Sequence, residues 1–195
     1  MAKDTTPYET QIVAYLDRIV RAIRRMENEA AVTCGLNPLQ LRILQFLLGN
    51  SHRKITVGFA AEELEVSEPT ISDSLRALET KELVIKTADA NDRRIKHLQL
   101  TAPGKKLAGR FANFSRLPLA TLDFGTLERL SGDLHRLVAM LFEKSLLKHA
   151  RICLTCAYFS PAEGEQPQTC RLLKKQLRTG DLQSDCHDHV YAHDR

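Results

Sequence analysis

The chain has 195 residues and a formal net charge of +4, and it is 43% hydrophobic and 27% charged. These values are typical of a globular protein with one main domain and an appendage, and they exclude two full-sized domains. No apolar run is long enough to span a bilayer and the N-terminus lacks a signal-like apolar segment, so we expect a cytoplasmic protein without a membrane partner. A reducing cytosol and an odd count of five cysteines argue against structural disulfides.

The first half of the chain has the periodicity of a series of helices. Apolar residues recur at helical spacing over about 8–31, which predicts one amphipathic helix long enough to pack against another chain. A second helix is expected over 38–49, with Asn37 as its N-cap and Pro38 in its first turn. The segment "TVGFAAEELE" predicts a short third helix, and "VSEPTISDSLRALETKELV" predicts a fourth that is capped by Ser67.

The pattern then changes from helical to alternating. The short segments "ELVIKTA" and "RIKHLQLT" flank "DANDRR", which predicts a β-hairpin with a charged tip. A fifth helix is expected after Thr101, and a last one over 124–150. This order is that of a helix-turn-helix followed by a wing, so the expected fold is mainly α, an α+β winged helix. We expect a DNA-binding and dimerisation domain over 1–150 and a cysteine-rich tail over 151–195.

Positive charge is concentrated near the expected wing. Residues 151–195 carry six basic and six acidic side chains, so the whole excess belongs to the first 150 residues. Between Arg93 and Arg110 there are six basic residues and no acidic one. Such a cluster is often only a solvated face, but its position at the wing and beside the fourth helix favours a surface for double-stranded DNA.

The fourth helix is expected to lie in the major groove, with its N-terminal residues against the base edges. Arg76 has the reach for a guanine edge, whereas Asp73 either accepts from a cytosine amino group, orients Arg76 or simply faces solvent. An arginine at the wing tip fits the narrow minor groove, and Asp92 can hold the tip in shape. The expected DNA-binding residues are Ser67, Pro69, Thr70, Ser72, Asp73, Arg76, Arg93, Arg94 and Lys96.

The segments "GLNPLQLRILQFL" and "AAEELEVSEPTISDSLRALETKELVIKTADANDRRIKHLQLTAPGKKL" resemble the MarR family of winged-helix transcription regulators. The resemblance covers about residues 8–148. It implies a homodimer that is joined through its N- and C-terminal helices and binds a pseudo-palindromic operator, rather than an enzyme. It also implies a small-molecule or redox effector, since many members release DNA in response to a phenolic ligand or an oxidant. Asp73 stands where such regulators often carry arginine.

The tail contains Cys153, Cys156, Cys170 and Cys186, and the first two form a C-x2-C pair that suits a metal chelate. Four thiolates around tetrahedral zinc are the commonest structural solution for such a set, and His189 could substitute for one of them. A segment of this length rarely folds without a staple. We therefore expect a metal site, with zinc as the first choice and an iron–sulfur cluster as the alternative.

Other readings of the cysteines remain open. The thiols could act in redox chemistry without a metal, although a C-x2-C oxidoreductase would need a βαβ context that this sequence does not show. The tail could also recruit a protein partner. Cys34, outside the tail, is expected to be a small buried hydrophobe.

Overall fold

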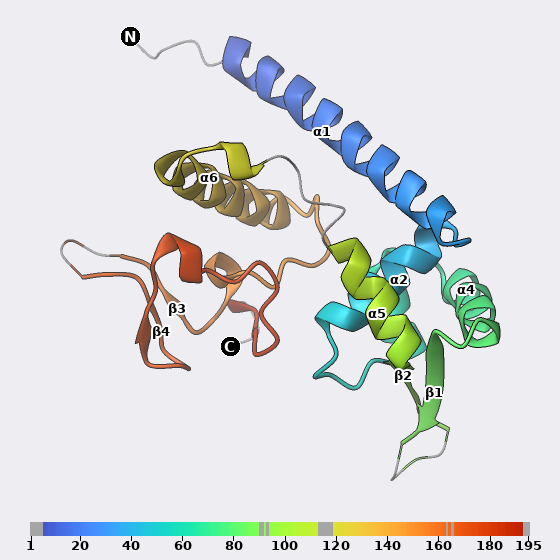
Figure 1. Cartoon of the computed structure of the whole chain (residues 1–195). Coiled ribbons are helices and arrows are strands. Elements are labelled where there is room, and N and C mark those ends of the chain that lie inside the picture. The colour runs from blue at the N-terminus through green and yellow to red at the C-terminus, as the bar shows by residue number, and fades with distance from the viewer. Residues whose placement is uncertain are drawn as a thin grey trace. The chain divides into compact units, whose positions relative to one another are not determined.

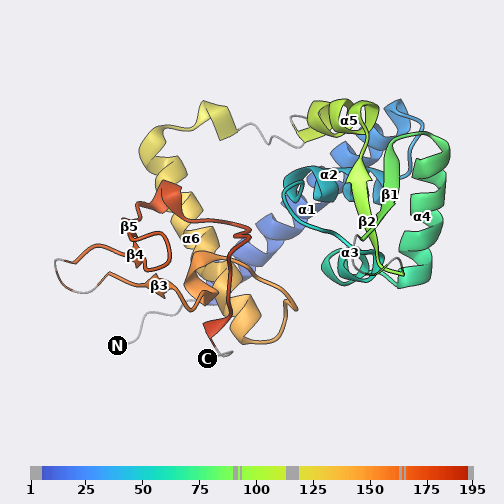
Figure 2. The same cartoon turned by 90° about the horizontal axis from the view of Figure 1, so that it is seen from below.

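A computed structural model describes residues 6–89, 92, 94–112, 119–162, 164 and 166–192 of the chain. The chain divides into two compact units, Met1–Leu117, which we call the winged-helix unit, and Pro118–Arg195, which we call the cysteine unit. In the described part of the chain, no helix is both long and apolar enough to cross a membrane. The winged-helix unit contains α1 (Thr6–Thr33), α2 (Pro38–Gly49), α3 (Val57–Glu63), α4 (Glu68–Thr80), β1 (Val84–Ala88), β2 (Lys96–Leu100) and α5 (Ala102–Ala112) (Figures 1 and 2).

The core of the winged-helix unit lies where α2, α3, α4 and the hairpin meet. On α4, Ile71, Leu75 and Leu78 are completely buried, as the spacing of the apolar residues predicts. Strands β1 and β2 pair in antiparallel fashion, and Ile55 adds an isolated bridge opposite Leu98. Helix α4 lies beside β1 in both views (Figures 1 and 2). The predicted α+β winged helix with a two-stranded wing is therefore confirmed.

Hydrogen bonds at the helix starts explain why these elements begin where they do. The Asn37 side chain accepts from the Gln40 N–H at 2.8 Å, and the Gln40 side chain accepts from the Asn37 N–H at 3.1 Å, which completes a capping box. At α5, the Thr101 hydroxyl accepts from the Gly104 N–H at 3.1 Å. The predicted cap at Asn37 is confirmed, and Thr101, after which a helix was expected, caps α5. Gly104 has a second role, because a Cβ there would lie 2.0 Å from the Leu83 carbonyl oxygen.

Helix α1 is amphipathic, but its apolar face has little cover within its own unit. Only Ala30 and Ala31 are buried. Tyr8, Ile12 and Tyr15 are each more than half exposed, and further apolar residues on the same helix are exposed as well. Most of the apolar face of α1 is therefore not covered by its own unit. Cys34, which follows α1, is half-buried and packs against the core, close to the expected role.

The elements of the cysteine unit are η1 (Leu119–Thr121), α6 (Phe124–Glu143), η2 (Cys153–Thr155), β3 (Phe159–Ser160), β4 (Thr169–Cys170), β5 (Lys175–Gln176) and η3 (Thr179–Asp181). Helix α6 ends at Glu143, so the expected continuation to residue 150 is wrong. Ser145 adopts a left-handed conformation, with φ of 57°, and the Leu146 N–H donates back to the Leu141 carbonyl at 2.9 Å. This pairing is a Schellman motif, which terminates a helix even without glycine.

The tail folds back on itself and packs against α6. The Cys186 N–H donates to the Arg151 carbonyl and the Ala157 N–H donates to the Val190 carbonyl, both at 2.7 Å. The Tyr191 ring stacks on Phe142 of α6, with 5.1 Å between the ring centroids. Because α6 packs with the tail, the division into compact units falls before α6 and does not coincide with the expected domain boundary at 150.

Candidate nucleic-acid interface and thiol cavity

The first turn of α4 is exposed and organised by side-chain hydroxyls. Ser67 is the N-cap and accepts from the Thr70 N–H at 3.4 Å, and the two hydroxyl oxygens lie 2.7 Å apart. Pro69 and Thr70 are exposed. Glu68 is an acidic neighbour that the sequence interpretation overlooked, and a Cβ on Gly58 would lie 3.0 Å from its carboxylate. The Glu68 carboxylate thus lies near the start of α3. The exposed face of the first turn of α4 is left to the hydroxyl groups of Ser67 and Thr70.

Further along α4, the structure brings Asp73 and Arg76 together. The Arg76 guanidinium donates to the Asp73 carboxylate at 2.7 Å, and the two side chains are 74% and 73% exposed. An ion pair this exposed contributes little to stability and is easily exchanged for another partner. Ser72 is half-buried, so it projects less fully than expected.

The wing tip has the internal contact that the sequence predicts. The Asp92 carboxylate accepts from the Arg94 backbone N–H at 2.9 Å and from its guanidinium at 3.3 Å. The Arg94 side chain is nevertheless 93% exposed. Lys96 is also exposed, at the start of β2. Arg93, the remaining predicted wing residue, lies outside the described residues.

A polar cluster at the base of the wing escaped the sequence interpretation. Asp89 Oδ2 lies 2.9 Å from both Lys54 Nζ and His97 Nε2, and the Asp89 and His97 side chains are only 12% exposed. The Asp92 N–H also donates to the other Asp89 oxygen at 3.4 Å. Asp89 therefore links the wing to the loop before α3. The only sequence signal was an aspartate after a strand, because Lys54 is distant along the chain.

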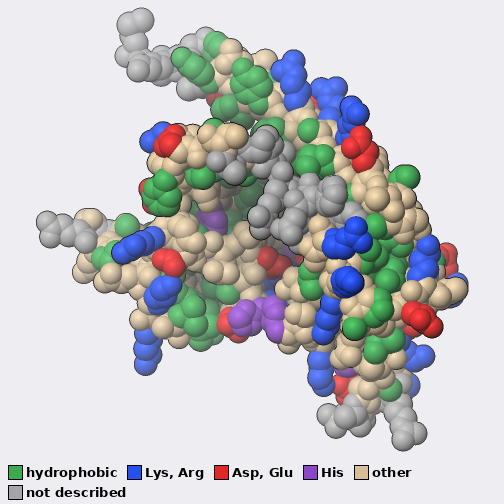
Figure 3. Space-filling model, in the orientation of Figure 1, with side chains coloured by type: hydrophobic (Ala, Val, Ile, Leu, Met, Phe, Trp, Pro, Cys, Tyr) green, Lys and Arg blue, Asp and Glu red, His purple; other side chains and the backbone are tan. Residues whose placement is uncertain are grey.

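Figure 3 shows the side chains of the winged-helix unit by type, with Lys and Arg in blue. Blue side chains lie along α1 and again around the lower end of this unit, where the hairpin is seen in Figure 1. Arg76 on α4 and Arg94 and Lys96 on the hairpin are exposed positive charges of this unit. Exposed hydroxyls and cations thus occur on neighbouring elements, an arrangement suited to a polyanion.

The four tail cysteines line one cavity of about 280 Å³. Cys153 and Cys156 come from the turn around η2, Cys170 from β4, and Cys186 from the returning C-terminal segment. No disulfide joins any of the five cysteines, all of which lie in the described part of the chain. The structure therefore brings together the four thiols that the sequence singled out.

Backbone amides approach two of these sulfur atoms. The Gln183 N–H donates to Cys153 Sγ at 3.3 Å, and the Asp188 N–H donates to the Cys186 thiol. Burial is the largest cause that raises the pKa of both thiols, and the charges of neighbouring cysteines raise it further, whereas these amide hydrogen bonds lower it. A positive centre between the thiols would remove the cost of ionising them together.

The His189 side chain contacts Thr155 and Tyr191 and does not line the thiol cavity. Its Nε2 lies 2.9 Å from the Thr155 hydroxyl, and its ring meets Tyr191 edge-on with 4.5 Å between centroids. It does not belong to the cavity lining, whereas His187 does. Burial lowers the pKa of His189, which favours the neutral imidazole. These contacts suit a packing residue of the tail better than a substitute ligand.

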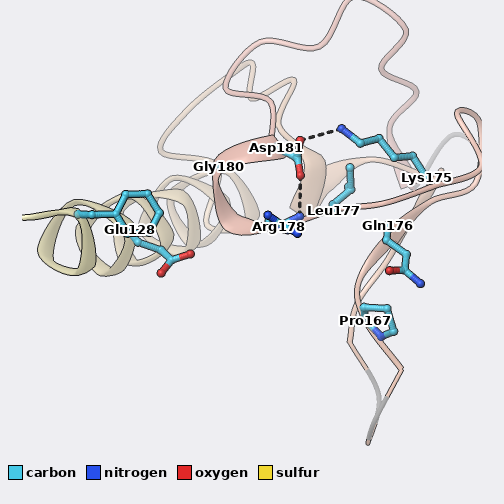
Figure 4. A pocket seen from close by; sticks show the side chains of 9 residues that line it. Glu128, Pro167, Lys175, Gln176, Leu177, Arg178, Gly180 and Asp181 are labelled. Atoms are coloured by element: carbon cyan, nitrogen blue, oxygen red, sulfur yellow. Dashed lines mark hydrogen bonds and ion pairs between the residues drawn. The ribbon is translucent and has the colours of Figure 1, made fainter.

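Within the described residues, no three His, Cys, Asp or Glu side chains have the arrangement required to hold one metal ion. A second pocket of about 760 Å³ shares the lining residues Lys175, Leu177 and Asp181 with the thiol cavity. Figure 4 shows the side chains of this second pocket, with Asp181 between Lys175 and Arg178. Lys175 Nζ lies 2.7 Å from Asp181 Oδ1, and the Arg178 N–H donates to the other oxygen at 3.0 Å.

Residues 35–95, which hold α2 to β1 and most of the wing turn, match the sequence model of the MarR family. Over these residues the winged-helix unit is similar to the MarR family. The match ends before the thiol cavity, so the winged-helix unit and the tail are interpreted separately. A comparison with curated proteins finds no match.

The winged-helix unit is also similar to solved structures. MepR of Staphylococcus aureus in its DNA-binding conformation is 25% identical, with a TM-score of 0.56 over 66% of this chain and 98% of MepR. The MepR–DNA complex is also 25% identical, with a TM-score of 0.54 over 66% and 97% of the two chains. YusO of Bacillus subtilis, 22% identical, shares the fold with a TM-score of 0.53 over 69% and 97%.

Proposed function

We propose that this protein is a DNA-binding transcription regulator. The observation that carries the proposal is the exposed first turn of α4 beside a hairpin with exposed Arg94 and Lys96, in a unit similar to the MarR family and to the MepR chain of the MepR–DNA complex. In a winged helix this turn enters the major groove and the wing lies over the adjacent minor groove. In this proposal the surface binds DNA and carries out no catalysis.

On α4, the side chains divide into positioning and reading roles. Thr70 and Ser67 hold the first turn and can donate to phosphate or to a base edge. Arg76 reads a guanine edge, and its exposed ion pair with Asp73 is exchanged for this contact on binding. Pro69 and Ser72 complete the surface. Asp73 thus places a negative charge near the groove. This charge opposes binding to operators in which Arg76 has no base to contact.

On the wing, the contacts serve affinity more than sequence choice. Arg94, held at its base by Asp92, is extended into solvent and suits the negative potential of a narrow minor groove. Arg93 and Lys96 add contacts to phosphates, which carry no sequence information. The cluster around Asp89 keeps the wing at a constant angle to the unit.

The regulator acts as a homodimer in this proposal. The apolar side chains of α1, among them Tyr8, Ile12 and Tyr15, are more exposed than is usual for a helix that packs only within its own chain. In the cysteine unit, Leu130 and Leu134 on α6 are exposed apolar side chains as well. A second copy that covers these faces would present two α4 helices to a pseudo-palindromic operator.

We further propose that the tail binds a metal through Cys153, Cys156, Cys170 and Cys186. The convergence of four thiols from three chain segments on one cavity supports this site. The metal either braces the tail, as zinc would, or makes the regulator responsive to metal or redox state. Metal analysis of the full-length protein tests the proposal, and a metal-free protein with an intact tail would contradict it.

The DNA proposal is tested with duplexes selected from a randomised pool, whose affinity for the full-length protein is measured by fluorescence anisotropy at several salt concentrations. Affinity should fall steeply as salt rises. Arg94→Ala should weaken binding to all duplexes and reduce the salt slope by about one. Arg76→Ala should cost about 1–3 kcal/mol on the selected duplex but little on others, because it removes a base contact.

Lys148→Ala is the matched control, because it removes one exposed positive charge from the cysteine unit. It should leave both affinity and salt slope nearly unchanged. If affinity proved insensitive to salt, or if the Arg94 and Arg76 variants both bound like the parent, the DNA-binding surface would have to be placed elsewhere.

A further inference from the structure

The four thiols line one cavity, but they are not arranged around a single point. Four thiolates that bind zinc close around one point, with each sulfur about 2.3 Å from the metal. The cysteines here line a cavity of about 280 Å³ together with other side chains, and within the described residues no three His, Cys, Asp or Glu side chains have the arrangement required to hold one metal ion. In an iron–sulfur cluster the four thiolates are divided among two or four iron atoms, so the sulfur atoms surround a volume rather than a point.

The wall of the cavity also suits an inorganic cluster. Phe159, Leu173 and Leu177 supply apolar side chains, and Leu177 is buried. The N–H groups of Gln183 and Asp188 point at two of the thiol sulfur atoms. Backbone amides that donate to cysteine sulfur, together with an apolar surround, are features that stabilise and tune protein-bound iron–sulfur clusters.

We infer that Cys153, Cys156, Cys170 and Cys186 hold an iron–sulfur cluster rather than a single zinc ion. This inference rests on the proposal that the tail binds metal, and it names the ligand of that same site. Each thiol loses its proton and binds one iron, while the iron charge offsets the four negative thiolates. His187 lines the cavity but lies 2.9 Å from Asp188, and it is not needed as a ligand.

An ion pair lines one side of the proposed cluster site. Lys175 and Asp181, 2.7 Å apart, line both the thiol cavity and the larger pocket that Figure 4 shows. The Lys175 side chain is 56% exposed, so this ion pair is in contact with solvent.

The test uses the full-length protein, purified without oxygen and analysed for iron, acid-labile sulfide and zinc. About two to four iron atoms and an equal amount of sulfide per chain, with an absorption band near 400 nm, are the expected result. Cys170→Ser should lose most of the iron and the band. Cys34→Ser, which changes the cysteine of the winged-helix unit, should retain both.

The outcomes separate this inference from the proposals on which it depends. A colourless protein with one zinc per chain would overturn the cluster and leave the metal site standing. A protein with no metal, also after incubation with iron and sulfide, would overturn both. The analysis of the unmodified chain is decisive even if the serine variant fails to fold, and DNA affinity measured in parallel reports on the regulator proposal alone.

Discussion

The two units of this protein obtain their stability in different ways. In the winged-helix unit, large side chains are completely buried: Leu41, Ile43, Leu44, Ile55, Ile71, Leu75, Leu78 and Val84 are all below 2% exposed. In the described part of the cysteine unit, the buried apolar residues are mostly small, such as Ala139, Ala150 and Ala157. Apolar burial at about 25 cal/mol per Å² therefore stabilises the winged-helix unit, whereas the cysteine unit buries fewer large side chains and relies more on specific polar contacts.

Removing the metal that we propose for the tail should produce the largest effect, and this effect should be confined to the cysteine unit. A structural metal can contribute on the order of 10 kcal/mol to the folding of the segment that binds it. Chelation should therefore expose the amides of the tail to rapid hydrogen exchange and leave those of α4 protected. Equal loss of protection in both units would show that they fold as one, contrary to this comparison.

Leu75→Ala tests the stability of the winged-helix unit. Leu75 is completely buried in the core of the winged-helix unit, so the cavity should cost about 2–5 kcal/mol of the free energy of unfolding. Denaturant unfolding followed by circular dichroism measures this loss, and metal content reports on the tail. Unchanged metal content is expected, whereas metal release at low denaturant would indicate coupling between the units.

Gly104→Ala should destabilise the winged-helix unit by about 3 kcal/mol or more, because the new Cβ would lie 2.0 Å from the Leu83 carbonyl oxygen. Gly109→Ala is the matched control on the same helix, where nothing lies within 4 Å of an added Cβ. That change should stabilise the helix by up to about 1 kcal/mol. Thermal unfolding of both variants gives the comparison, and equal melting temperatures would contradict the close approach.

The smallest effect is expected for Thr155→Val in the cysteine unit. The Thr155 hydroxyl donates to the Ala150 carbonyl and lies 2.9 Å from His189 Nε2. Valine keeps the shape but leaves these buried partners unpaired, at a cost of about 1–3 kcal/mol. The variant should release metal at a lower chelator concentration than the parent. Ser184→Ala, at an exposed position of the same unit, should behave like the parent.

Local patterns were enough to predict much of the fold and part of the candidate surface. The caps at Asn37 and Ser67 and the contact between Asp92 and Arg94 involve residues at most three positions apart. The same locality explains one error, since the apolar pattern continued beyond Glu143 while a left-handed Ser145 ended α6. A left-handed serine has no sequence signature comparable to that of glycine.

By itself, the sequence determined the order of the elements, the family resemblance of the winged helix and the four thiols of the tail, because apolar period, capping residues and cysteine spacing are local properties. Only the tertiary structure decided that Lys54 meets Asp89, that the His189 ring lies beside the Thr155 hydroxyl, and that the thiols line one cavity. These features join residues far apart along the chain, and their distances depend on how the whole backbone packs.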